Sequence, residues 1–231
     1  VFPELDKEKR VKRIHVGNGF NKNHSIVLSS FEDVRTLSNR LGENIDAWVK
    51  QESKVQQMPG FKSTKSGRYP EEAQVEMKKG DKLGKEVRID FKALYVFSKI
   101  LLDKYVKFLY FINPVDGIRS GTIDAFLNSL ENSVGNPESF YGGLSTDLEQ
   151  TSGQILNKLT FYRSKKIEHE QLLNEDVWFM NDMRGGIAIS HVDRDGDDSV
   201  VTIQPGELLD LLKDFLAITS SYFMRNRDRI T

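Results

Sequence analysis

The sequence has 231 residues, of which 38% are hydrophobic and 29% charged, so the chain can bury a sizeable core and is not globally disordered. Its 33 basic and 34 acidic residues nearly cancel, which excludes a globally basic nucleic-acid binder but leaves a local basic patch open. Cysteine is absent, which excludes disulfides, thiolate catalysis and cysteine-ligated metal centres and fits a cytoplasmic location.

No apolar run approaches the roughly 20 residues that a membrane-spanning helix needs. The longest apolar-rich stretch, Phe91 to Ile112, is interrupted by five charged side chains. The first five residues, Val1 to Leu5, also lack the basic-then-apolar layout of a signal peptide. We therefore expect no association with a membrane.

The first 24 residues are mixed and polar, and they predict an N-terminal arm or an edge strand. Arg13 to Val16 has the composition of a short strand, and the glycines of Gly17 to Gly19 predict a turn after it. The remaining residues, 25–231, are expected to form a single helical domain.

Two long helices are predicted, with a loop between them. Apolar residues recur every three or four positions from about Ser29 to Val55 and again from about Val87 to Ile112. Residues 56–84 lack this period and contain several Pro and Gly residues, so they are interpreted as a long surface loop.

Shorter elements follow. Helices are predicted over about 122–131 and about 146–168, separated by a connection over 132–145. Thr146 and Glu149 have the spacing of a capping box at the start of the second of these helices. Between 175 and 204 the period falls to about two, which predicts three short strands, and Pro205 then opens a last amphipathic helix. The predicted fold is mainly α, a helical bundle of four to five helices with a small antiparallel β-sheet inserted before the C-terminal helix.

Most motifs of cofactor and metal sites are missing. The four histidines do not have metal-binding spacing, and neither a P-loop nor a dinucleotide-binding loop is present. The acidic segment Asp193 to Asp198 lacks the spacing of a calcium loop and is better interpreted as a hairpin tip. No cofactor and no metal are expected.

One segment carries residues suited to phosphodiester chemistry, at the end of the helix predicted over 146–168. Arg163 and His169 are separated by five residues, and Lys165 and Lys166 lie between them. A histidine can transfer a proton near neutral pH, and an arginine can stabilise a negatively charged phosphorane. In a straight helix the two residues differ by about 120° in direction and by ~9 Å along the axis, a gap that a long Arg side chain can reduce.

This segment resembles the Arg–x(4–6)–His signature of HEPN domains, helical bundles that carry the signature near the end of a late helix. The resemblance implies a metal-independent endoribonuclease in which the ribose 2′-hydroxyl attacks the phosphodiester. It also implies a homodimer with a composite site and a possible role as a toxin or antiphage effector, with an antitoxin or another protein as partner.

By this resemblance His169 is the acid–base and Arg163 stabilises the transition state. Ser164 takes the polar position that follows the arginine, where the family usually has Asn or Asp. Lys165, Lys166 and Tyr162 are assigned to contacts with RNA, the lysines because of their charge.

Three alternatives remain open. Arg184 and His191 form a second Arg–His pair with six intervening residues, in strand-like sequence. Arg163 and His169 could instead be a surface ion-pairing residue and a helix-terminal residue. The whole chain could also be a non-catalytic helical module that binds protein or nucleic acid.

Overall fold

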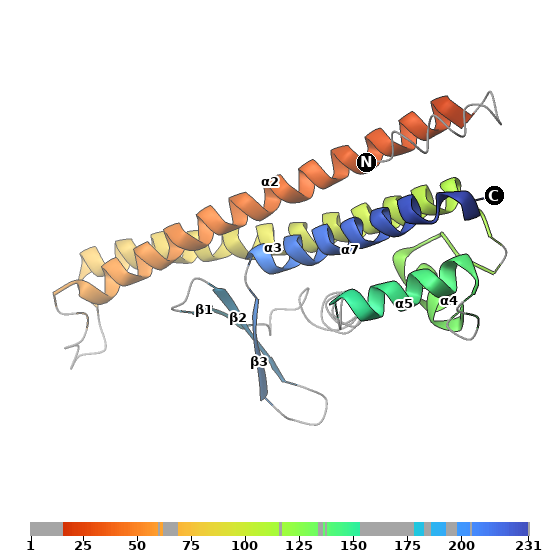
Figure 1. Ribbon diagram of the computed structural model, residues 1–231. Coiled ribbons are helices and arrows are strands. Elements are labelled where there is room, and N and C mark those ends of the chain that lie inside the picture. Colours follow the sequence, from red (N-terminus) through yellow and green to blue (C-terminus); the bar gives the residue numbers. More distant parts are fainter. Residues whose placement is uncertain are drawn as a thin grey trace. The chain divides into compact units, whose positions relative to one another are not determined.

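The structure is a computed structural model, and it confirms that the chain is mainly α (Figure 1). It describes residues 16–59, 61, 69–115, 117–133, 136, 138–152, 178–182, 186–192, 198–203 and 205–230. Within these ranges there are five α-helices, three strands and one short 3₁₀ helix, η2 (Arg227–Arg229).

The chain divides into two compact units. The described part of unit 1 consists of residues up to Arg35, residues 95–152 and residues from Leu209 onward. Unit 2 contains Thr36–Leu94 and the described residues from 178 to Leu208. The two long helices, α2 (Val16–Gln57) and α3 (Glu71–Ile112), each contribute residues to both units.

Both long helices repeat their buried residues every seven positions, the spacing of helices that pack as coiled coils. The main repeat of α2 is Phe20, Val27, Val34, Leu41, Trp48 and Val55. The two interleaved repeats of α3 are formed, in chain order, by Ala73, Met77, Gly80, Gly84, Val87, Phe91, Leu94, Ser98, Leu101, Tyr105, Phe108 and Ile112. All of these are buried except Met77 and Gly84, which are half-buried. A seven-residue repeat keeps one face of each helix against its neighbour, which explains how both can reach 42 residues.

Both helices begin earlier than predicted. Helix α2 begins at Val16, so the turn predicted at Gly17 to Gly19 is wrong, and residues 16–24 of the predicted arm are helical. The part of the arm before Val16 lies outside the described residues. Helix α3 begins at Glu71, so the loop predicted over 56–84 is wrong from residue 71 onward.

The glycines of α3 explain the second error. A Cβ added at Gly84 would lie 3.3 Å from Cε2 of Trp48, so this glycine lets the indole ring of α2 approach the α3 backbone. Gly80 is likewise buried, opposite Gln51. Small residues at these buried or half-buried positions hide the apolar period on which the loop prediction rested, whereas they are the close-packing positions of a continuous helix.

Unit 1 surrounds the C-terminal half of α3 with three shorter helices, α4 (Ile123–Ser133), α5 (Phe140–Ser152) and α7 (Pro205–Arg225). Helix α7 begins at Pro205, as predicted, and lies beside α3 in Figure 1. The Tyr105 hydroxyl lies 2.6 Å from Oγ1 of Thr219 and joins these two helices. The Tyr141 hydroxyl donates to the carbonyl of Asn113 at 2.8 Å and attaches α5 to the end of α3.

The start of α5 also differs from the prediction. Ser139 caps the helix, because its Oγ accepts a hydrogen bond from the backbone N–H of Gly142 at 3.0 Å. Thr146 is inside α5 and donates to the Gly142 carbonyl at 3.1 Å, so the predicted capping box is wrong. A Cβ at residue 142 would lie 2.2 Å from the Asn136 carbonyl oxygen, which explains why a glycine occupies the first turn.

The three strands belong to unit 2 and form one antiparallel sheet in the order β1 (Trp178–Asp182), β2 (Gly186–Val192) and β3 (Asp198–Ile203) (Figure 1). Trp178 pairs with Ser190, and Ile187 pairs with Ile203. The residues between consecutive strands, 183–185 and 193–197, lie outside the described residues.

Candidate functional site

The Arg–His motif that the sequence singled out lies outside the described residues, together with the neighbouring residues assigned to RNA contacts. These residues are Tyr162, Arg163, Ser164, Lys165, Lys166 and His169. Arg184 of the competing pair is also outside, whereas His191 lies in β2 with its backbone opposite Ser199. The meeting of a guanidinium and an imidazole therefore stays a prediction for both pairs.

The structure does bring together a polar cluster that the sequence analysis did not predict, around Asp90 of α3. The Asp90 side chain is only 7% exposed, although it carries a carboxylate. Arg40 of α2 donates to both of its oxygens, with Nε at 2.9 Å from Oδ2. Asn44, one turn further along α2, donates to the same Oδ2 at 2.8 Å. This buried carboxylate is thus held by a two-pronged Arg contact and an amide.

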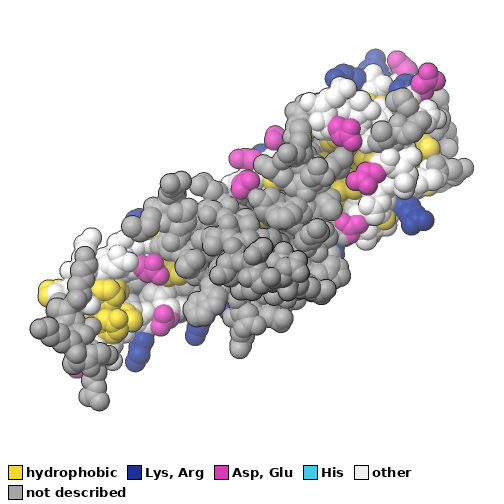
Figure 2. Space-filling model, turned by 90° about the horizontal axis from the view of Figure 1, so that it is seen from below, with side chains coloured by type: hydrophobic (Ala, Val, Ile, Leu, Met, Phe, Trp, Pro, Cys, Tyr) yellow, Lys and Arg dark blue, Asp and Glu magenta, His cyan; other side chains and the backbone are white. Residues whose placement is uncertain are grey.

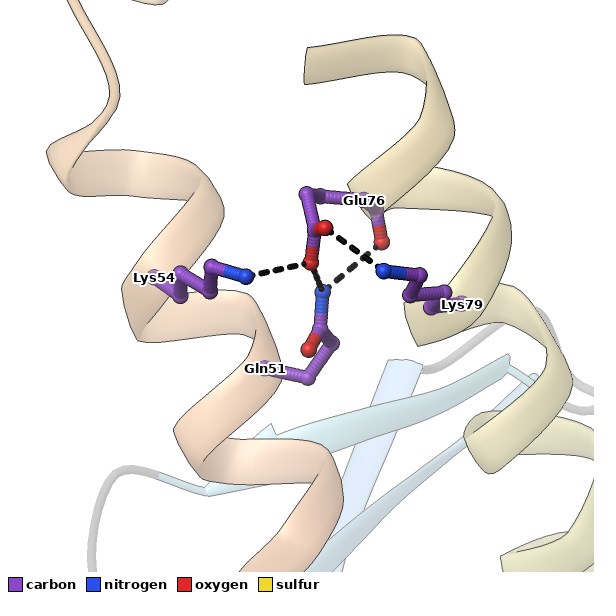
Figure 3. Close-up of polar contacts among 4 residues, drawn as sticks. All are labelled: Gln51, Lys54, Glu76 and Lys79. Carbon is purple, nitrogen blue, oxygen red and sulfur yellow. Dashed lines mark hydrogen bonds and ion pairs between the residues drawn. The ribbon is translucent and has the colours of Figure 1, made fainter. Parts of the chain in front are cut away.

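A second cluster in unit 2 surrounds Glu76, whose side chain is 13% exposed (Figure 3). Lys54 of α2 donates to Oε2 at 2.8 Å, and Lys79 of α3 donates to Oε1 at 2.7 Å. Gln51 donates to Oε2 at 2.7 Å and to the Glu76 backbone carbonyl at 3.0 Å. Figure 3 shows these donors converging on the carboxylate from both helices.

The donors around Glu76 stabilise its charged form. Hydrogen bonds from Lys54, Lys79 and Gln51 lower the pKa of Glu76 from 4.5 to about 2, so it is ionised at neutral pH. A carboxylate with this pKa is a poor proton acceptor, and its two oxygens are already occupied by donors. Glu76 is therefore suited to holding α2 against α3 and unsuited to general acid–base catalysis.

The described tyrosines with shifted pKa values belong to the core of unit 1, and the described histidine with a shifted pKa lies half-buried beside it. Burial raises the pKa of Tyr105 to about 12 and also raises that of Tyr141, so both phenols stay protonated. The ring of His24 packs beside Phe20 and Phe108, with centroids 5.9 Å and 6.0 Å away, and burial lowers its pKa. His24 is thus neutral near pH 7 and packs half-buried against the aromatic core.

One face of α3 exposes large apolar side chains. Ile89 is 63% exposed, Val96 53%, Phe97 38% and Ile100 39%. Their spacing places them on one side of the helix, opposite the seven-residue repeat that is buried. Exposed neighbours of this kind on one helix are a candidate protein contact surface. The signal in the sequence was the unusually wide apolar surface of the helix predicted over 87–112.

The described surface does not show a single-sign electrostatic patch on the face drawn in Figure 2. Acidic and basic side chains are scattered over it, and small apolar groups lie between them. Among the described residues, no group of three or more His, Asp or Glu side chains could hold a metal ion. No helix in the described ranges is both long and apolar enough to cross a membrane.

No protein-family model, curated protein or solved structure matches this chain.

Proposed function

We propose that this chain is a HEPN-like, metal-independent endoribonuclease of the cytoplasm, acting as a toxin or antiphage effector. The observation that carries the proposal is the order of elements along the chain. Two long helices and two short ones, α2 to α5, come first, the Arg163–His169 motif follows, and one amphipathic helix, α7, comes last. This order agrees with a helical bundle that carries its Arg–x(4–6)–His signature late in the sequence. In this proposal the small sheet before α7 is an insertion in the bundle.

The proposed chemistry needs only groups supplied by the motif and by RNA. His169 takes the proton of the ribose 2′-hydroxyl, whose oxygen attacks the adjacent phosphorus while the bond to the 5′-oxygen breaks. Arg163 stabilises the charge that develops on the phosphorane, and Ser164 supplies a hydroxyl beside it. The leaving 5′-oxygen takes up a proton from water, and the products are a 2′,3′-cyclic phosphate and a free 5′-hydroxyl. Lys165, Lys166 and Tyr162 contact the RNA.

Variants of the motif test this proposal. His169→Ala and Arg163→Ala are each expected to lower RNA cleavage by at least 10²-fold in the presence of EDTA, since each removes a group that acts in the transition state. The substrate is a fluorescently labelled RNA, and the same RNA with a 2′-deoxy nucleotide at the cleaved position should resist cleavage.

The matched controls are Arg184→Ala and His191→Ala, which alter the competing Arg–His pair and should leave cleavage intact. Circular dichroism of each variant checks that the helices are retained. Full cleavage by His169→Ala, with loss of cleavage by His191→Ala, would transfer the assignment to the second pair. Equal cleavage by all four variants would remove it.

We further propose that the active form is a homodimer and that α3 supplies part of its contact surface. Val96, Phe97 and Ile100 are the exposed apolar residues of α3 that lie closest together, and we place the centre of the contact between Val96 and Phe97. Suppose that a second copy of α3 lies antiparallel across a two-fold axis at this centre. Each residue then faces the residue of the second copy that lies equally far on the other side of the axis, so the two residue numbers add up to 193. Val96 then faces Phe97 of the second copy, and Ala93 faces Ile100, so small side chains lie opposite large ones.

Charge agrees with the same register. Glu86 would face Lys107 of the second copy, and the symmetry forms this ion pair twice. Both residues lie on the face of α3 that carries the exposed apolar side chains, one at each end of the segment. This register thus pairs the apolar centre with itself and Glu86 with Lys107, while Ile89 faces Lys104 of the second copy.

A charge placed in the centre of this surface should dissociate the dimer. Val96→Glu is expected to give a monomer in sedimentation equilibrium at a concentration where the unchanged protein is dimeric, because two carboxylates would be buried close together. Val75→Glu is the control, because Val75 is on the same helix and similarly exposed, at 49%, but lies outside the paired segment. The surface is assigned wrongly if both variants, or neither, become monomeric.

The exposed face of α3 also favours a second function, a non-catalytic helical module that binds a protein partner. The effects of Val96→Glu and His169→Ala on RNA cleavage and on partner binding distinguish the two functions. A binding module would cleave no RNA at high protein concentration. It would form a complex with its partner that Val96→Glu disrupts and His169→Ala leaves intact.

A further inference from the structure

We draw no further inference here: the strongest candidate, the surface patch formed by the stacked rings of Phe61 and Tyr69 beside the connection from α2 to α3, carries nothing because nothing in the structure shows what covers it.

Discussion

The contacts that α3 makes in unit 1 differ in kind from those it makes in unit 2. In unit 1 the buried repeat of α3 is made mainly of large side chains, Leu101, Tyr105, Phe108 and Ile112. In unit 2 it includes the small residues Ala73, Gly80 and Gly84, and both glycines lie close to side chains of α2. Unit 2 adds instead two carboxylates, Asp90 and Glu76, whose donors come from α2 or from both helices.

The difference shows how one helix can obtain stability and specificity from separate segments. Large apolar side chains contribute free energy in proportion to the area they bury, but they tolerate shifted packing. Small residues bury less area and admit more than one register, so a polar contact is needed to select one. Asp90 supplies such a contact, since a shift along the helix would leave its buried charge without Arg40.

Shortening a large side chain in unit 1 should produce the largest loss. Phe223→Ala removes a fully buried ring that packs on Phe140 and Tyr141, with ring centroids 4.9 Å and 6.2 Å away. We expect the free energy of unfolding to fall by about 3–5 kcal/mol, because the cavity cannot close completely. Urea denaturation monitored by circular dichroism measures this change.

Phe111→Ala is the control for this substitution. It removes the same atoms, but from a side chain of unit 1 that is 37% exposed. Its expected cost is smaller, since part of this ring is already in contact with solvent and its removal leaves a smaller closed cavity. Equal losses for Phe223→Ala and Phe111→Ala would show that the aromatic cluster does not dominate the stability of unit 1.

The large residues of unit 1 were largely accessible to sequence reasoning, whereas the helix ends were not. Apolar residues at helical spacing predicted the buried faces of α3 and α7, because a period needs no knowledge of the partner helix. The start of α2 was misjudged because Gly17 to Gly19 was interpreted as a turn, and the starts of α3 and α5 were placed too late, although Gly80 and Gly142 lie inside these helices. A glycine is a breaker or a close-packing position depending on what it faces, and only the fold shows that. The strict seven-residue repeat was the signal that would have extended both long helices.

The polar clusters could not be predicted for the same reason. Asp90 and Arg40 are 50 residues apart, and their meeting depends on the antiparallel register of two helices. An aspartate inside an otherwise buried helical stripe does signal a charge with a partner, but the sequence does not name the partner. The reverse holds for the Arg163–His169 pair. The sequence alone suggested it, because its residues are close along the chain, but they lie outside the described ranges.

Removing the partner of a buried charge should give the second largest effect, now in unit 2. Arg40→Met leaves the Asp90 carboxylate buried with Asn44 as its remaining described donor. We expect a loss of about 2–3 kcal/mol, which is the cost of an incompletely paired buried charge. Arg40→Met combined with Asp90→Leu should recover most of this loss, because an apolar pair of similar size has no charge to desolvate. Urea denaturation of both proteins measures the difference.

The double variant also separates stability from register. If Asp90 selects the register, the double variant should be stable and yet show broader amide resonances or additional oligomers, since its helices can pair in more than one way. A double variant as unstable as Arg40→Met alone would mean that Arg40 acts through packing of its side-chain stem. A stable double variant with one sharp set of resonances would assign the register to the remaining contacts.

The smallest predicted effect concerns the dependence of unit 2 on pH. Because the folded state lowers the pKa of Glu76 from 4.5 to about 2, this group stabilises the fold fully above pH 4.5, and the contribution disappears as the pH falls toward 2. Glu76→Gln keeps the shape of the side chain but cannot be ionised. Its urea midpoint should therefore lie below that of the unchanged protein at pH 7, and the gap should close between pH 4.5 and pH 2.

Glu43→Gln, at an exposed position of α2, provides the comparison and should show a smaller gap that changes less with pH. A gap for Glu76→Gln that stays constant down to pH 2 would indicate that Lys54 and Lys79 hold the side chain by shape and hydrogen bonding, with no contribution from its charge.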